Sequence, residues 1–231
     1  MNNKNYINKS WQDAKDGSTL KVENPFTEEI IAEVPNSSAS DVDHAVSVAK
    51  AVWKDWKMMG SLEMRDLLRE VAVKSRAHDR EIASIITAES GKPLIECLDE
   101  IEWIASIFEY YSEIGRDQRG RVVAPVTPRS MSMVVKEAYG VVGCIVPWNY
   151  PLLLMAWKVA PALSAGNTVV VKPSEITPLS ILHWMDVACD HLPDGILNII
   201  TGAGETGAAL VEHPDTTVSY THLTLPTTPY V

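Results

Sequence analysis

The sequence is poor in cysteine and in basic residues. Its 231 residues include three widely spaced cysteines, Cys97, Cys144 and Cys189, with no CxxC pair and no histidine cluster nearby. This pattern predicts no metal site and is typical of free thiols in a reducing, cytoplasmic environment. The chain has 20 basic against 30 acidic side chains, a formal net charge of −10. That balance argues against nucleic acid or an anionic membrane as a partner, because both attract basic patches.

The chain also lacks the signals of secretion and membrane insertion. The first 17 residues contain neither an apolar core segment nor the arginines of an organelle-import sequence. Residues 138–157 carry no charge over 20 positions, about the span of a bilayer, but two glycines, two prolines and an asparagine interrupt them. Such interruptions leave backbone groups unpaired in lipid, so we expect a buried strand, a loop and a buried helix there.

Residues 1–118 are expected to form short strands followed by helices. The first 38 residues are polar and rich in turns, with a strand predicted at Glu29–Val34. Ser40 with Asp43 resembles a capping box, and Asp79 is expected to cap a later helix. Apolar residues at helical spacing predict four helices, at 40–56, 61–77, 79–89 and 94–114.

From residue 119 to 139 the apolar period changes to two. The sequence RVVAPVTPRSMSMVVKEAYG predicts two strand segments interrupted by Pro125 and Pro128. Because proline cannot donate to a central strand, the first segment is expected at a sheet edge or in a projecting β arm.

After Gly140 buried strands and helices alternate. We expect strands at 141–146, 167–173 and 196–200, with helices at 151–166, 177–192 and 205–213. This order predicts parallel strands joined by right-handed crossovers, an α/β fold with a doubly wound Rossmann-like sheet over residues 140–219. Residues 220–231 have no charge and no periodic apolar face, so we expect a disordered or foreign tail.

The stretch TGAGETG places Gly202, Gly204 and Gly207 in a GxGxxG pattern between a strand and a helix. In a dinucleotide-binding turn, backbone N–H groups and the helix dipole meet a pyrophosphate at this point. The acid that this fingerprint requires about 20 residues downstream is absent. A plain strand-to-helix turn is therefore an equal alternative.

The residues Lys172, Pro173, Ser174 and Glu175 follow the second of these strands, at the edge where α/β sheets bind ligands. A carboxylate there can accept both hydroxyl groups of a ribose, and the lysine can donate to the same sugar. The alternative is that Glu175 is an acid in the first turn of the next helix, where the helix dipole favours it.

The stretch VPWNYP, residues 146–151, follows the first strand. Its two prolines stiffen the loop around Asn149. A preorganised amide at a sheet edge can stabilise an oxyanion by roughly 3–4 kcal/mol, and the alternative role is to cap the next helix. Because this loop, 172–175 and 201–207 follow three successive parallel strands, we expect all three at one edge.

The segment GVVGCIVPWNYPLLLMAWKVAPALSAGNTVVVKPSEITPLS, with ESGKP and VENPFTEEIIAEVP, closely resembles the NAD(P)-dependent aldehyde dehydrogenase superfamily. The resemblance covers about residues 5–219. It implies a homo-oligomer in which residues 119–139 belong to the oligomerisation domain. Glu175 would favour NAD, with NADP as the alternative cofactor, because a carboxylate repels a 2′-phosphate.

The resemblance also implies roles for individual residues. Asn149 would donate to the oxyanion, and Lys172 with Glu175 would bind the adenosine ribose. The loop from Gly204 to Gly207 and its helix would lie by the adenine and pyrophosphate. The nicotinamide side would be lined by Ile145, Val146, Pro147 and Trp148.

The sequence departs from the family after Ser219, where the family continues with Phe-Thr-Gly-Ser. The family's nucleophilic cysteine and general-base glutamate lie beyond that point, so we expect an N-terminal fragment that binds NAD without catalysing the reaction. The competing hypothesis is a catalytic aldehyde dehydrogenase. Cys144 belongs to a buried strand and is not expected to be a nucleophile.

Two aromatic residues bear on the substrate. Tyr150 and Trp157 are expected to flank the aldehyde entrance, where their ring faces suit a cationic substrate such as betaine aldehyde or an amino-aldehyde. The alternative is a generic apolar tunnel for an aliphatic aldehyde or a semialdehyde.

Overall fold

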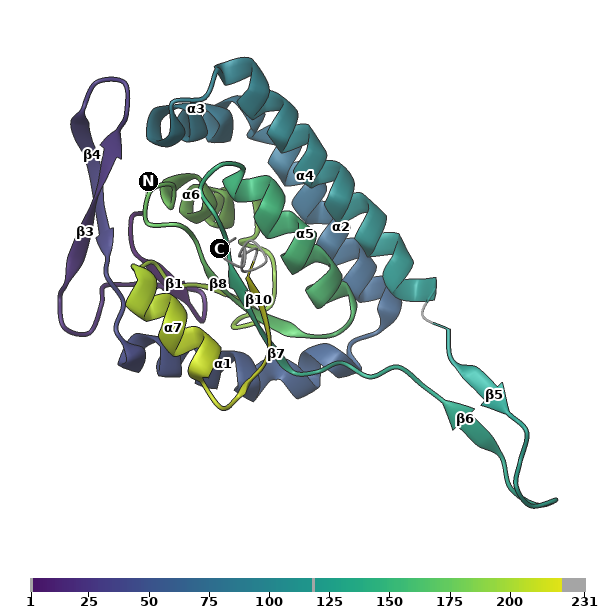
Figure 1. Ribbon diagram of the computed structural model, residues 1–231. Helices are drawn as coiled ribbons and strands as arrows, with labels where there is room; N and C mark the ends of the chain where they lie inside the picture. The colour runs from purple at the N-terminus through teal and green to yellow at the C-terminus, as the bar shows by residue number, and fades with distance from the viewer. Residues whose placement is uncertain (1, 118, 222–231) are drawn as a thin grey trace, which may run out of the picture.

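The computed structural model describes residues 2–117 and 119–221 (Figure 1). The described strands form three sheets, and helices lie between them along the chain. The helices are α1 (Ala39–Met58), α2 (Ser61–Ala77), α3 (Asp79–Ser90), α4 (Leu94–Ile114), the 3₁₀ turn η1 (Gly115–Asp117), α5 (Pro151–Ser164), α6 (Leu179–Ala188) and α7 (Gly204–Glu212). The strands are β1 (Asn5–Ile7), β2 (Ser10–Gln12), β3 (Thr19–Asn24), β4 (Glu29–Pro35), β5 (Arg121–Val123), β6 (Ser132–Val134), β7 (Val141–Ile145), β8 (Thr168–Lys172), β9 (Leu197–Ile199) and β10 (Thr216–Thr221).

The central sheet has the order β10-β7-β8-β9-β1-β2. Strands β10, β7, β8 and β9 are parallel, whereas β1 joins β9 and β2 in antiparallel fashion. Helices α1 and α7 cover one face, and α5 and α6 cover the other beneath an outer layer of α2, α3 and α4 (Figure 1). The expected doubly wound α/β sheet is confirmed.

The side chains of each buried strand point alternately to the two faces of the sheet and pack into two separate apolar clusters. Val169 and Val171 of β8 pack into the larger apolar cluster with α5 and α6, whereas Val170 between them packs into a second cluster with α1. All three are fully buried. Side chains of a strand point to opposite faces in turn, so a run of valines suits a strand covered on both faces.

The expected N-cap of the first helix was wrong by two positions. Ser38, not Ser40, is the N-cap of α1, with the extended backbone φ −86°, ψ 175° that a cap requires. Asp41 takes the role expected of Asp43, since its Oδ2 accepts a hydrogen bond from Ser38 N at 2.8 Å. Asp79 is likewise not a cap but the first residue of α3, after His78 at the N-cap.

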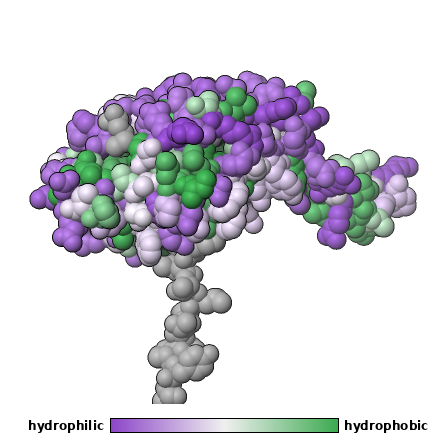
Figure 2. Space-filling model, turned by 90° about the horizontal axis from the view of Figure 1, so that it is seen from above, coloured by the Kyte–Doolittle hydropathy of each residue, from purple (hydrophilic) through white to green (hydrophobic). Residues whose placement is uncertain are grey.

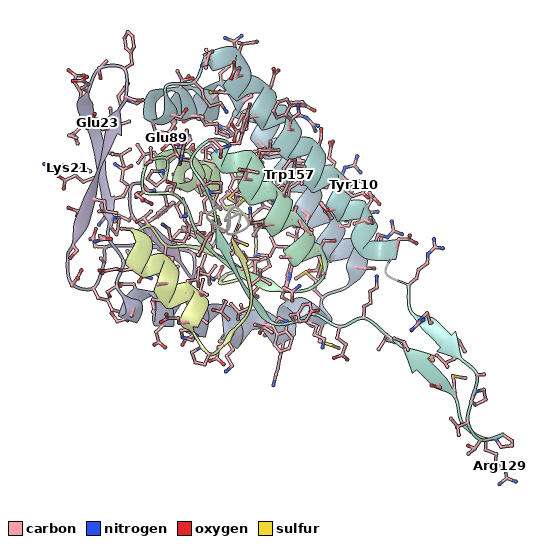
Figure 3. The ribbon with its side chains drawn as sticks, in the orientation of Figure 1. Lys21, Glu23, Glu89, Tyr110, Arg129 and Trp157 are labelled. Atoms are coloured by element: carbon pink, nitrogen blue, oxygen red, sulfur yellow. The ribbon has the colours of Figure 1, made fainter. Side chains whose placement is uncertain are left out.

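The β arm is confirmed as a separate hairpin. Strands β5 and β6 pair in antiparallel fashion and project from the body, with Arg129 at the tip (Figures 1 and 3). Two features were not predicted. Strands β1 and β2 join the central sheet, and β10 extends the described backbone to Thr221, past the end expected at Ser219. The remaining expected tail, residues 222–231, lies outside the described residues.

Candidate functional site

Three loops leave the central sheet at one edge. In the register of the sheet, Ile145 at the end of β7 pairs with Lys172 at the end of β8, and Val171 pairs with Ile199 at the end of β9. The loops that follow these strands therefore start side by side at their carboxyl ends, as expected.

The first loop is tied to the sheet at its start and exposed at its centre. Val146 is buried, and its N–H donates to the Lys172 carbonyl at 3.0 Å. Pro147 is half-buried, whereas Trp148 is 55% exposed and Asn149 is also exposed. Thr177 Oγ1 donates to the Trp148 carbonyl at 3.4 Å, which joins this loop to the next.

Asn149 does not cap α5. The helix begins at Pro151 with Tyr150 at the N-cap, and no N-cap side chain bonds to it. Within the described residues the Asn149 side chain makes no hydrogen bond, so its amide is available to a ligand. The helix N-terminus is satisfied instead by Glu100 of α4, whose Oε1 accepts from Leu152 N at 3.0 Å and Leu153 N at 3.1 Å.

Glu100 and Lys92 were missed in the sequence. Glu100 is fully buried, and its Oε2 lies 2.7 Å from Lys92 Nζ. The Lys92 ammonium lies 3.7 Å from the centre of the Tyr150 ring, a cation–π contact. Glu100 lies between Cys97 and Ile104 at helical spacing, on the buried face of α4, and this signal could have identified it.

Lys172, the last residue of β8, places its buried ammonium group between the second and third loops. Its Nζ lies 3.4 Å from Glu175 Oε2 and also 3.4 Å from the Ala203 carbonyl. Burial lowers the pKa of Lys172, and the Glu175 carboxylate partly opposes that effect. The Glu175 side chain is 48% exposed, so its carboxylate is open to solvent.

The alternative role of Glu175 as a first-turn acid is wrong. Helix α6 begins at Leu179 and has no acid in its first turn. Pro173 and Ser174 are buried, and Ser174 Oγ accepts from Ile176 N at 3.3 Å, which shapes the turn that presents Glu175. The N-terminus of α6 is bonded by buried Glu89 of α3, which accepts from Leu179 N at 2.6 Å and also from Ser180 (Figure 3).

The third loop opens α7. Gly202 has φ +159°, and a Cβ there would lie 2.0 Å from Thr206 Oγ1, so this position requires glycine. Gly204 is the exposed first residue of α7 and has open space beside it. Gly207 is buried, and a Cβ there would lie 3.5 Å from Ile145 Cδ1 and 3.6 Å from Lys172 Cδ. The first turn of α7 thus adjoins Lys172.

Tyr150 and Trp157 lie in different surroundings. Trp157 is 51% exposed and lines a cavity of about 830 Å³ with Tyr111, Lys158 and other residues along α5 (Figure 3). Neither Asn149 nor Tyr150 is among the residues that line it. Tyr150 faces Lys92 and also pairs with Trp103, at 6.2 Å between ring centres. The structure therefore does not bring the two aromatics together in one pocket.

All three cysteines are buried and free. Burial raises the pKa of Cys144 to about 12 and also raises the pKa values of Cys97 and Cys189. A nucleophilic thiol needs an exposed site that lowers its pKa, so none of them has nucleophilic character here. Across 2–117 and 119–221, no group of three or more His, Cys, Asp or Glu side chains is arranged to hold a metal ion. None of the described helices is both long and apolar enough to span a membrane.

The chain is similar to known proteins in sequence and in fold. Residues 11–221 match the family described as "Aldehyde dehydrogenase family". The chain is 40% identical over 219 residues to Betaine aldehyde dehydrogenase 1 of Oryza sativa subsp. japonica, covering 90% of this chain and 43% of that protein. It is 39% identical over 218 residues to Aminoaldehyde dehydrogenase 2 of Zea mays, with the same coverage. The chain thus spans less than half the length of these relatives.

Solved structures share the fold. Betaine aldehyde dehydrogenase of Staphylococcus aureus, solved with NAD+, superposes with a TM-score of 0.91 at 31% identity, covering 95% of this chain and 45% of that one. A 3,6-anhydro-L-galactose dehydrogenase, solved in complex with NAP, gives a TM-score of 0.91 at 34% identity, covering 94% of this chain and 46% of that one.

Proposed function

The chain belongs to the aldehyde dehydrogenase family, and on that premise we propose that it binds NAD and supplies the oxyanion donor for oxidation of an aldehyde to a carboxylic acid. The observation that carries this proposal is the meeting of three loops at one sheet edge, where Lys172 Nζ reaches both Glu175 and the Ala203 carbonyl. A ribose-binding pair and the open first turn of a helix are thereby adjacent, as a dinucleotide requires.

The residues at this edge fit a dinucleotide. The half-exposed Glu175 carboxylate can accept the two hydroxyl groups of the adenosine ribose, and Lys172 can donate to the same sugar. The N–H groups of the first turn of α7, from Gly204, would lie by the adenine and pyrophosphate, and there is open space beside Gly204. Ile145, Val146, Pro147 and Trp148 would line the nicotinamide side. A carboxylate at Glu175 disfavours a 2′-phosphate, so NAD is proposed over NADP.

The chemistry assigned to this chain is positioning and charge stabilisation. When bound, the nicotinamide accepts the hydride of the aldehyde carbon. Attack of a thiolate on that carbon places negative charge on the carbonyl oxygen, and the free Asn149 amide is proposed to donate a hydrogen bond to it. The thioester that follows is hydrolysed by water. Because Cys97, Cys144 and Cys189 are buried, we propose that the nucleophilic thiol lies outside residues 1–231. The family resemblance implies the same for the general base.

The substrate class follows from the relatives and from the aromatics. We propose a cationic aldehyde, because the relatives are named for betaine aldehyde and aminoaldehydes. Lys92 occupies a face of the Tyr150 ring, so Trp157 is the better candidate for contact with a substrate cation. An aliphatic aldehyde or a semialdehyde is the alternative. The cytoplasmic location stays a prediction.

The arm is proposed to join copies of the protein. Figure 2 shows apolar side chains gathered on the projecting arm. The exposed apolar residues there include Val122, Val126, Met131, Met133 and Val135. Because a two-stranded hairpin is not stable alone and these side chains face solvent, we propose that the arm packs against another copy in a homo-oligomer.

Because the nucleophilic thiol is proposed to lie outside this chain, we predict that the chain alone does not oxidise an aldehyde. With NAD and betaine aldehyde, the purified chain is expected to produce no NADH above the rate without protein. The folded chain is also expected to react with a thiol reagent far more slowly than the chain unfolded in guanidinium, because its thiols are buried. Protein-dependent NADH formation that is abolished when Cys97, Cys144 or Cys189 is replaced by serine would contradict this prediction. It would favour the hypothesis that the chain is itself catalytic.

A further inference from the structure

The start of α5 depends on an acceptor from another part of the chain. Pro151, the first residue of the helix, has no N–H, and the N–H of Leu154 donates to the Tyr150 carbonyl at 3.0 Å. The N–H groups of Leu152 and Leu153 remain, at the second and third positions of the helix. These are the N–H groups that the side chain of an N-cap residue normally bonds.

Glu100 of α4 supplies that acceptor. Its Oε1 accepts from Leu152 N at 3.0 Å and from Leu153 N at 3.1 Å. The N-cap residue itself, Tyr150, makes no side-chain bond to the helix, and its ring packs against the Lys92 ammonium. Lys92 Nζ also lies 2.7 Å from the other Glu100 carboxylate oxygen, which holds the fully buried carboxylate in place. Glu100 therefore does for α5 what an N-cap side chain does in other helices.

Asn149, beside the helix start, is itself a residue of the capping type. Asparagine is favoured at N-caps because its carboxamide oxygen accepts from an N–H two or three residues further along the chain. Leu152 is three residues after Asn149, so its N–H is the donor that Asn149 Oδ1 would take. That N–H is bonded to Glu100 instead, and the Asn149 side chain is exposed, with no hydrogen bond to any described residue. The two side chains compete for one donor, and Glu100 holds it.

We propose that Glu100 is a positioning residue for Asn149, an inference that rests on the proposed function of this edge. A carboxamide that capped α5 would have its orientation set by Leu152. Because Glu100 satisfies the helix start, the Asn149 amide is left free to orient toward the oxyanion. Glu100 itself touches neither substrate nor cofactor.

The inference is tested by a double-mutant cycle on the whole chain, with unfolding in urea followed by tryptophan fluorescence. Asn149→Ala in the parent is expected to change the unfolding equilibrium constant by less than about twofold, because the side chain that it removes is exposed and unbonded. In the Glu100→Ala background Asn149 is expected to cap α5, so the same substitution should raise the constant about fivefold. Glu100→Gln keeps an acceptor for the helix, and Asn149→Ala should again have less than about a twofold effect there.

Glu102→Ala is the matched control background. Glu102 is an exposed carboxylate on the same helix, and its partners are Arg76 and Ser106. Asn149→Ala is expected to have the same small effect in that background as in the parent. If Glu100→Ala does not fold, the cycle is run in Glu100→Leu/Lys92→Met, which removes both charges of the buried pair and also leaves the helix N–H groups without their acceptor.

The outcomes separate the inference from the function beneath it. Equal effects of Asn149→Ala in the parent and in the background without the Glu100 carboxylate would overturn the inference and leave the proposed function standing. A large effect that persists in Glu100→Gln would also overturn it, because the acceptor is retained there. The cycle needs no ligand, so titration of the parent with NADH tests the proposed function separately. A folded parent that binds no NADH overturns that function, and the role given to the free Asn149 amide falls with it.

Discussion

Replacement of Glu100 by alanine is expected to lower the free energy of unfolding by about 3–5 kcal/mol, because it removes one partner of a buried ion pair. The Glu100 side chain is fully shielded from solvent, and the Lys92 side chain is only 15% exposed. The substitution leaves the Lys92 ammonium without its carboxylate and leaves the N–H groups of Leu152 and Leu153 without an acceptor. Urea denaturation followed by tryptophan fluorescence measures the change.

The matched control lies on the same helix. Glu102 pairs with Arg76 at 2.8 Å, but its side chain is 55% exposed, so Glu102→Ala is expected to cost at most about 1 kcal/mol. Glu100→Gln retains an acceptor for the helix N–H groups but not the charge. Its loss of unfolding free energy is therefore expected to lie between those of Glu100→Ala and Glu102→Ala. Equal losses for Glu100→Ala and Glu102→Ala would show that the Glu100–Lys92 pair does not anchor α5.

The stability of the parent is expected to fall as the pH rises from about 5 to 8, through the ionisation of Glu89. Burial raises the pKa of Glu89 to about 8, although hydrogen bonds from Ser180 and Leu179 oppose the shift. A raised folded-state pKa means that the folded state holds the proton more tightly than the unfolded state. The stabilisation is therefore complete below the ordinary glutamate pKa and is lost as the pH passes the folded-state value, a change on the order of 4 kcal/mol.

Glu89→Gln isolates this effect from the other titratable groups of the chain. Glutamine cannot ionise, so the variant is expected to show a flatter profile of unfolding free energy between pH 5 and 8. The difference between parent and variant at each pH gives the Glu89 contribution. Parallel profiles for the two chains would mean that Glu89 keeps the same ionisation state in the folded and unfolded chains.

Local pattern was enough to predict the elements that carry the cofactor loops. The continuous apolar run at Val169–Val171 and the proline breaks within 146–151 are local features, so the order of these strands and helices followed from sequence. Parallel pairing then placed Asn149, Glu175 and Gly204 at one edge, because each follows the carboxyl end of a strand. The N-cap of α1 was missed by two residues because Ser38 and Ser40 are both plausible caps.

The buried polar side chains that hold these loops and helix ends in place could not be predicted, because they belong to distant parts of the chain. Helical spacing places Glu100 on a buried face, but only the fold shows that it caps α5. The same holds for Glu89 at α6 and for Asn5, whose partner Thr201 lies 196 residues away. Buried polar side chains need partners, but sequence does not say which ones.

The most direct test of the cofactor site is titration of the parent chain with NADH, followed by energy transfer from tryptophan to the nicotinamide. Trp148 lies exposed at the proposed site. We predict saturable binding to the parent, weaker by about tenfold in Glu175→Ala and unchanged in Glu212→Ala at the far end of α7. A folded parent that shows no saturable transfer, or a Glu175→Ala chain that binds NADH as tightly as the parent, would contradict the assignment of this edge.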